Sequence, residues 1–174
     1  MSKQSRYFIL TMIFISVFSC VSFSQKAAKD PQGKDILDYL IGTWDMKGEV
    51  QGKPCTYSFE SSRVLLDKLV LMHMKDLGVP CQYEADVYIG LDTARSSYVT
   101  FWLDNFGVDS SMSVLAYGKR YGDTLFIPFN FPGSPFRDTF TYDRVNDTWR
   151  FLLEDGSKGK WVTFADYTLV RKKK

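Results

Sequence analysis

The sequence has a single histidine, His73, and contains neither a Cys-x-x-Cys nor a Gly-x-Ser-x-Gly motif. A zinc site needs several His, Cys or carboxylate ligands, and a Ser-His-Asp triad needs a histidine beside a nucleophile and an acid. The missing Cys-x-x-Cys argues against a dithiol redox site, and the missing Gly-x-Ser-x-Gly argues against an α/β-hydrolase nucleophile. We therefore predict no metal site, no cofactor and no catalytic residue.

An excess of positive charge is also missing, since the chain carries 22 Lys+Arg against 20 Asp+Glu. Residues 7–19 form an apolar run that follows Lys3 and Arg6 and is shorter than the roughly 20 residues of a membrane span. Ser22-Phe23-Ser24 offers the small residues that signal peptidase prefers, so we predict a signal peptide over 1–24. Its removal takes away both basic residues and no acidic one, which leaves 20 of each sign. A near-neutral mature chain does not favour nucleic acid as a partner.

Export would place the mature protein in the periplasm or outside the cell, with no transmembrane segment left. Two alternatives stay open: the apolar run could be retained as a membrane anchor, or Cys20 could be lipidated. Cys55 and Cys81 would remain after cleavage, and an oxidising compartment permits a disulfide between them. A predicted strand separates the two strands at which they lie, so the sequence leaves this disulfide undecided.

The remaining chain divides into a polar, flexible lead-in over 25–34 and one domain over 35–174. Apolar residues at helical spacing follow Asp35 and end at Gly42, which predicts a short helical turn. Beyond it the residues alternate between apolar and polar, as in half-buried strands. The predicted strands cover 43–50, 55–62, 69–75, 82–91, 98–104, 112–117, 124–129, 137–144, 148–154 and 161–171.

Short strands at regular spacing, without a long helix, are typical of a sandwich or a barrel. Sequential short turns favour a meander, and closing the meander removes exposed sheet edges. We predict an all-β fold, an antiparallel up-and-down β-barrel of about ten strands with a short N-terminal helical turn. Pro128 interrupts its strand, which indicates a sheet edge or a bulge at that point.

Gly42-Thr43-Trp44, placed after a helical turn, resembles the start of the lipocalin-like (calycin) barrels, which include the fatty-acid-binding-protein type. In that family an arginine on or after the last strand packs over the tryptophan and closes one end of the barrel. The resemblance thus implies structural roles for Gly42, Trp44 and Arg171. A stacked guanidinium and indole contribute about 0.5–2 kcal/mol.

A second resemblance covers most of the mature chain and is to a bacterial family of uncharacterised function with a predicted lipocalin-like barrel. The chain departs from its pattern at Leu91, where an aromatic residue is usual, and at Asn105, where a small polar residue is usual. No catalytic residues are established for that family, so the resemblance implies a fold and a ligand-binding style. The matching motifs are Leu40-Ile41-Gly42-Thr43-Trp44, Ile89-Gly90-Leu91-Asp92, Tyr98, Trp102-Leu103-Asp104-Asn105, Gly118, Gly122-Asp123-Thr124-Leu125 and Phe136-Arg137.

The favoured function is binding of a small hydrophobic or amphipathic molecule inside the barrel, near its open end. The candidate ligand-binding residues are His73, Trp102, Tyr117, Arg137 and Tyr142. Arg137 opens a strand after a Pro/Gly loop and is the candidate for holding an anion. Alternatives stay open, because these aromatic residues could simply fill the core of a structural or interaction protein. A hydrolase or isomerase that uses His73 or an acid is a further alternative.

Overall fold

Buried and exposed residues alternate along most strands, so one face of a continuous sheet encloses the apolar side chains. The computed structural model describes residues 33–106, 115–131, 134–157 and 159–173. The predicted signal peptide, Cys20 and most of the predicted lead-in lie outside the described residues. A 3-10 turn, Ile36–Tyr39, precedes the strands and is capped by Asp35, whose Oδ1 accepts a hydrogen bond from the backbone N–H of Leu37.

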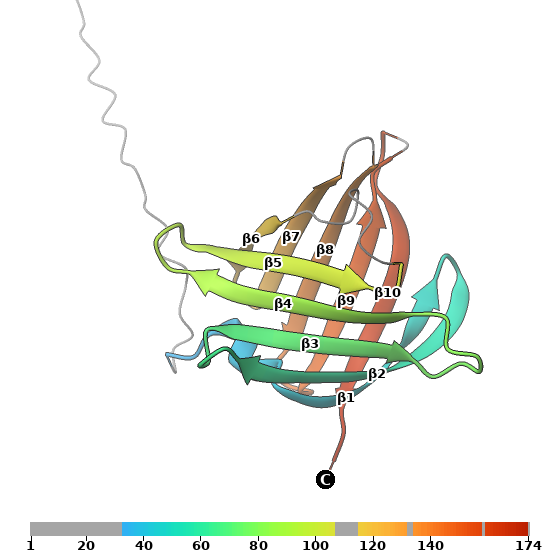
Figure 1. The fold of residues 1–174 in the computed structure, drawn as a ribbon, viewed down its shortest axis with the longest axis horizontal. Helices are drawn as coiled ribbons and strands as arrows, with labels where there is room; N and C mark the ends of the chain where they lie inside the picture. Colours follow the sequence, from blue (N-terminus) through green and yellow to red (C-terminus); the bar gives the residue numbers. More distant parts are fainter. Residues whose placement is uncertain (1–32, 107–114, 132–133, 158, 174) are drawn as a thin grey trace, which may run out of the picture.

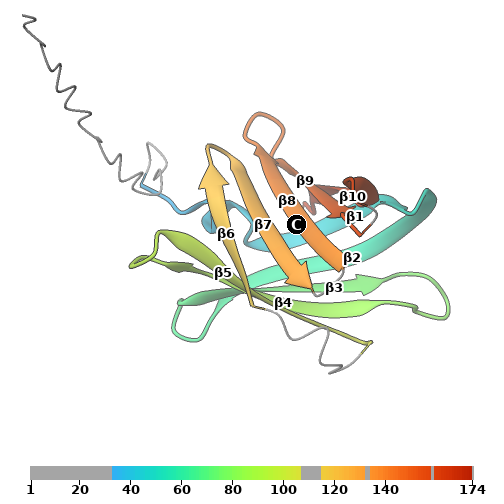
Figure 2. The ribbon, with the colours of Figure 1, turned by 90° about the horizontal axis from the view of Figure 1, so that it is seen from above.

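The sheet has ten strands, each paired with its neighbours in sequence, and β1 pairs with β10 to close it. The predicted all-β, antiparallel up-and-down barrel is therefore confirmed. In Figure 1 the wall formed by β3–β5 crosses steeply in front of the wall formed by β7–β10, and Figure 2 shows the same walls from above. The strands are β1 Gly42–Val50, β2 Lys53–Val64, β3 Leu69–Asp76, β4 Glu84–Asp92, β5 Ser97–Asp104, β6 Ala116–Tyr121, β7 Thr124–Phe131, β8 Ser134–Asp143, β9 Thr148–Asp155 and β10 Val162–Arg171.

The sixth strand differs from the prediction over 112–117, because β6 runs from Ala116 to Tyr121. Residues 112–114 lie outside the described residues. The predicted turn at 118–123 is mostly strand, since Gly118 lets β6 approach β7 closely: a Cβ there would lie 2.7 Å from the carbonyl oxygen of Phe126. Only the end of the predicted turn reverses the chain, at Gly122, which has a φ of +60°.

Pro128 lies within β7 and pairs with Arg137 of β8, in a strand that has a neighbour on both sides. The described pairing between β6 and β7 runs from Tyr121–Thr124 to Lys119–Phe126 and does not reach Pro128. The missing N–H of proline therefore costs this ladder no hydrogen bond. Of the two predicted alternatives, the sheet edge is absent from the closed barrel, and the described pairing of β7 with β8 shows no bulge at Pro128. The proline lies beyond the described pairing of β7 with β6.

The end of the barrel next to the 3-10 turn is closed by Trp44 and Arg171. The Arg171 guanidinium lies 4.0 Å from the centroid of the Trp44 ring, which is the stacking contact that the sequence predicts. Its Nη1 and Nη2 donate to the carbonyl oxygens of Ile41 and Tyr39 at 2.7 and 2.9 Å, and its Nε pairs with Asp147. The arginine thereby satisfies backbone acceptors that the short turn leaves free. We call the half of the barrel that contains this contact the closed half.

Candidate functional site

The other half of the barrel, which we call the open half, has an interior of a different kind. Slight exposure occurs in both halves, at Tyr142 in the closed half and at Tyr57 and Tyr167 in the open half, so the halves differ in chemistry rather than in burial. The open half combines rings that carry polar groups with a carboxyl group, all on inward-facing positions. We define the open-half cluster as Tyr57, Tyr83, Trp102, Asp138 and Tyr167.

Strand alternation sets the direction of each member of the open-half cluster. Tyr57 lies two residues before Phe59 on β2, Tyr83 lies two residues before Ala85 of β4, and Tyr167 lies between Ala165 and Leu169 on β10. Since residues two apart on a strand share a face, these rings point where the apolar core points. Asp138 follows the same rule, because Phe136 and Phe140 flank it on the inward face of β8.

The rings of the open-half cluster contact one another mainly through their edges. The Tyr57 ring meets those of Tyr167 and Tyr83 edge-on, at centroid distances of 5.5 and 6.2 Å. The Trp102 indole N–H donates to the Tyr83 hydroxyl at 3.0 Å, and that hydroxyl donates to the Asp104 carboxylate at 3.5 Å. Trp102 and Tyr167 also make tilted contacts with Phe151, at 6.2 and 5.9 Å, and an aromatic face attracts cations.

The tyrosine hydroxyls of the cluster remain protonated at neutral pH. Burial raises the pKa of Tyr83, and the negative charge of Asp104 raises it further. Burial raises the pKa of Tyr167 as well, and so does its neighbour Tyr57. Each hydroxyl therefore keeps a proton to donate and lone pairs to accept with.

Asp138 is the most unusual residue of the interior. It is 2% exposed, and its Oδ1 has no hydrogen-bond partner in the part of the chain that the structure describes. Its cross-strand neighbours are Ile127 and Leu153, which offer the side chain no polar group. Burial raises the pKa of this carboxyl group well above its usual value. An unsatisfied buried polar group costs about 1–3 kcal/mol, so the carboxyl group weakens the fold unless something else binds it.

Two buried hydroxyls, Ser97 Oγ and Thr100 Oγ1, also lack a partner among the described residues. Neither carries an ionisable group, and a neutral hydroxyl costs less to bury than a carboxylate. Asp138 is therefore the polar group of the interior with the strongest requirement for a partner.

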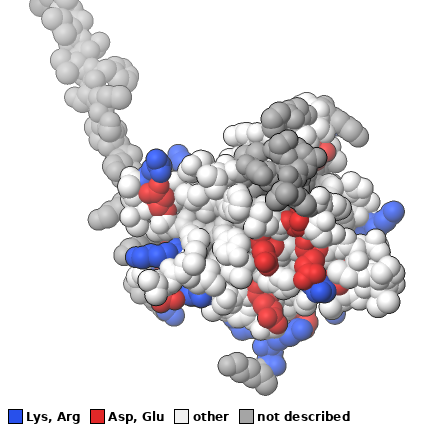
Figure 3. Space-filling model, viewed as in Figure 1, with Lys and Arg blue, Asp and Glu red and all other residues white. Residues whose placement is uncertain are grey.

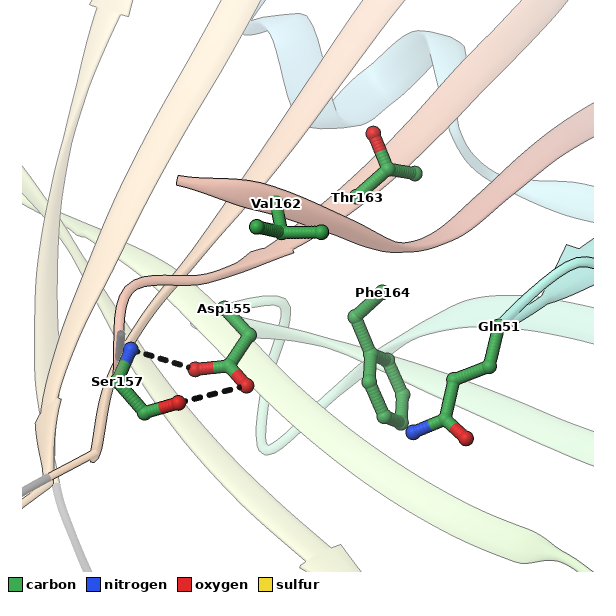
Figure 4. Close-up of a pocket in the computed structure, with 6 residues that line it drawn as sticks. All are labelled: Gln51, Asp155, Ser157, Val162, Thr163 and Phe164. Carbon is green, nitrogen blue, oxygen red and sulfur yellow. Dashed lines mark hydrogen bonds between the residues drawn. The ribbon is translucent and has the colours of Figure 1, made fainter. Parts of the chain in front are cut away.

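A pocket of about 400 Å³ lies at the mouth of the open half, between the β1–β2 turn and the loop that joins β9 to β10. Figure 4 shows Gln51 beside Phe164 at one side of it, and Asp155 with Ser157 at the other. Asp155 accepts hydrogen bonds from the Ser157 N–H and hydroxyl at 2.8 and 3.0 Å. The Phe164 ring packs edge-on against Phe136 at 5.2 Å, and Phe136 precedes Asp138 on the inward face of β8. This volume lies within the range of small-molecule sites.

Of the five ligand-binding residues predicted from the sequence, the structure places only Trp102 in the open half of the interior. Tyr142 also points inward, but it lies in the closed half, stacked on Tyr39 and hydrogen-bonded to Asp147. Tyr117 lies on the outer face of β6 and is 49% exposed. The five residues therefore do not form one site.

Arg137 lies on the outer face of β8, where it cannot hold an anion inside the barrel. Its guanidinium makes two hydrogen bonds to Glu154 of β9, at 2.6 and 2.9 Å, and lies 4.2 Å from the ring centroid of Trp161. The adjacent residue, Asp138, takes the inward position on β8 in its place.

His73 also lies on the outer face, on β3, where it lines a surface pocket of about 300 Å³ together with Glu84 and Asp86 rather than the barrel interior. Its Nδ1 lies 2.7 Å from Asp86, and its Nε2 lies 3.4 Å from Glu84. Figure 3 shows acidic side chains gathered on this face, over β3–β5. Within the described ranges no group of three or more His, Cys, Asp or Glu residues is arranged to hold a metal ion.

Cys55 and Cys81 are both free thiols, so the disulfide that the sequence left undecided is not formed. Cys55 lies on β2, and Cys81 lies in the loop between β3 and β4 with its thiol directed to the Tyr83 carbonyl oxygen at 3.4 Å. The strand β3 separates β2 from β4, which keeps the two residues apart in the sheet.

Sequence reasoning missed Tyr57, Tyr83, Asp138 and Tyr167. Each of the four lies two positions along the chain from an apolar residue of the core. Because residues two apart on a strand share a face, this spacing could have predicted that their side chains point inward. A comparison with protein-family models finds no match to this chain, and a comparison with curated proteins finds none either. In the described residues there is no helix of the length and apolar character that crossing a membrane requires.

Proposed function

We propose that this protein binds a small amphipathic molecule in the open half of its barrel. The observation that carries the proposal is the open-half cluster itself, with its aromatic rings, protonated hydroxyls and a carboxyl group that is unpartnered among the described residues. A pocket of about 400 Å³ at the mouth of the same half, lined by other residues, offers a point of entry. Ligand sites combine apolar walls with a few polar groups that fix orientation, and barrel mouths are a common place for them. The apolar part of the ligand would contact the rings, and its polar part would bind the hydroxyls and the carboxyl group.

The first experiment is mass spectrometry of small molecules and lipids extracted from natively purified protein, followed by titration with amphipathic probes. The protein contains four tryptophans, of which Trp102 belongs to the cluster while Trp161 lies on the outer face at 43% exposure. A bound probe should change the fluorescence of Trp102, so Trp102→Phe should remove the response and the matched Trp161→Phe should keep it. An empty extract together with no saturable response would contradict the proposal.

We also propose export, with cleavage after Ser24, on the strength of the leader-like N-terminus. Expression of the full chain in a bacterial host, with intact-mass measurement of the mature protein, tests this. A mature chain that begins at Gln25 is the expected result. A lipid-modified chain that begins at Cys20, or an uncleaved chain, would contradict soluble export.

A further inference from the structure

We propose that the open-half cluster is a site for an organic amine, whose ammonium group pairs with Asp138 and lies against the faces of the surrounding aromatic rings. This inference rests on the proposed function and names the class of ligand. It differs from the expectation, drawn from the sequence, that Arg137 holds an anionic ligand.

The buried position of Asp138 requires a hydrogen-bond donor that the protein does not supply. Its Oδ1 is unpartnered within the described residues, and no other Asp, Glu, Lys or Arg among them is as deeply buried. Its cross-strand neighbours are aliphatic, so any donor must come from the inward side of the sheet. An ammonium group supplies donors together with the opposite charge, and a charge-assisted hydrogen bond is roughly twice as strong as a neutral one.

The rest of the open half favours a cation over an anion. Asp104 contacts Tyr83 near the rim, and Asp155 lines the mouth pocket, so a ligand that enters passes carboxylates. The buried inward positions described in this half contain no Lys or Arg, and Lys53, which shares the inward side of β2, is exposed at the start of that strand. A carboxylate ligand would therefore find no cationic partner at the described buried positions, whereas the tyrosine and tryptophan faces attract a cation.

Binding should release a proton. The raised pKa of Asp138 means that the carboxyl group is protonated in the free protein at low pH and over part of the range above its usual value. An ammonium ligand favours the ionised carboxylate, so pairing displaces that proton and affinity should rise with pH up to the pKa of Asp138 in the free protein. The other titratable groups that face this region are Tyr57, Tyr83, Cys55, Asp104 and Tyr167, with Asp155 at the mouth and Asp76 close enough to act on Tyr57 and Cys55. Burial raises the pKa of Tyr57, Tyr83, Cys55 and Tyr167, so these four stay neutral near neutral pH.

The test compares three probes with the same alkyl chain and different headgroups: dodecylamine, dodecanol and dodecanoate. Each is titrated into the full chain by isothermal calorimetry below its aggregation limit, in two buffers of different ionisation enthalpy. We expect dodecylamine to bind at least about tenfold more tightly than dodecanoate, with a buffer-dependent heat that reports proton release. Equal affinity for the two ions, or tighter binding of dodecanoate, would overturn the amine assignment and leave the proposed function standing.

Asp138→Asn supplies the decisive variant, because it keeps the shape and removes the ionisable group. It should lose the preference for dodecylamine and the proton release, while dodecanol affinity changes by less than about threefold. The matched control is Asp86→Asn, which removes one negative charge from the outer face and should keep the preference. A thermal melt shows whether each variant is folded. If Asp138→Asn does not fold, Asp138→Leu provides a second test. If folded Asp138 variants still prefer dodecylamine over dodecanoate, the amine inference is overturned. If none of the three probes binds to the unmodified protein, the proposed function itself is contradicted.

Discussion

The two halves of this barrel bury aromatic residues in opposite ways. In the closed half, Trp44 and Trp149 are fully buried, and their indole N–H groups donate to carbonyl oxygens of the 3-10 turn region, those of Leu40 and Tyr39. In the open half, Trp102 is only partly buried and donates to another side chain, the hydroxyl of Tyr83. The two indoles of the closed half find their partners in the backbone, whereas the open half includes a carboxyl oxygen that has no partner among the described residues. This difference separates the structural part of the interior from the part available to a ligand.

The same contrast appears in two aspartates on either side of the barrel. The Arg171 hydrogen bonds lower the pKa of Asp147 in the closed half, while burial raises the pKa of Asp138 in the open half. A lowered pKa reports an ionised group that the fold stabilises, and a raised pKa reports an ionised group that the fold disfavours. Only the second aspartate would gain from a partner brought from outside.

The largest expected effect is that of removing the closed-half tryptophan. Trp44→Ala should lower the free energy of unfolding by about 3–5 kcal/mol, since it deletes a completely buried ring and its contact with Arg171. Denaturant unfolding measures the loss. The folded fraction should bind the probe with an affinity near that of the unmodified protein. Loss of binding in a fully stable variant would contradict the assignment of a structural role to the closed half and of ligand binding to the open half.

Asp138→Leu should change stability in the other direction. Replacing an unpartnered buried carboxyl group by an apolar side chain of similar size should raise the free energy of unfolding by about 1–3 kcal/mol. The measurement is again denaturant unfolding, with Asp86→Leu on the outer face as the control. A marked loss of stability in Asp138→Leu would indicate that the carboxyl group has a structural role.

The pH dependence of stability should have opposite signs for the two aspartates. Asp147 has a lowered pKa in the folded state, so its contribution is present above the unfolded pKa and is lost as pH falls through the folded pKa. Asp138 has a raised pKa, so the protein should lose stability as pH rises from the unfolded value through the folded one. Thermal melts of Asp147→Asn, Asp138→Asn and the unmodified protein are recorded over a range of pH, and the stability of each variant is subtracted from that of the unmodified protein. The two differences should change with pH in opposite directions, and a change in the same direction would contradict the contrast between the two aspartates.

The smallest expected effect is that of removing a single hydroxyl in the open half. Tyr167→Phe keeps the ring and should change the free energy of unfolding by no more than about 1 kcal/mol. Tyr142→Phe in the closed half removes the hydrogen bond to Asp147 and should cost a similar amount. Calorimetric titration with dodecylamine should distinguish them, because only Tyr167→Phe should alter binding.

The strand pattern could be predicted because alternation is a local property of the sequence, and this was sufficient for the barrel and for most strand positions. Gly42, Trp44 and Arg171 could be related to one another through a family resemblance, although they lie at opposite ends of the chain. β6 was misplaced because the role of Gly118 depends on its contact with β7, which the sequence around it does not reveal.

The site was harder to predict, because residue chemistry and residue direction gave conflicting answers. Arg137 was chosen for its charge, but the inward face of β8 is fixed by Phe136 and Phe140, which select Asp138. A shift of one residue exchanges the two faces of a strand, so the choice between neighbours decides whether the interior favours an anion or a cation. His73 points outward for a related reason, since its apolar neighbours Met72 and Met74 occupy the inward face.

The most direct test of the two-halves account is to follow the four indole N–H signals by two-dimensional NMR during titration with dodecylamine. The account predicts a saturable shift of the Trp102 signal, with the signals of Trp44 and Trp149 in the closed half and of Trp161 on the outer face unchanged. A shift confined to Trp161, or one that includes Trp44 and Trp149 to the same extent as Trp102, would contradict it.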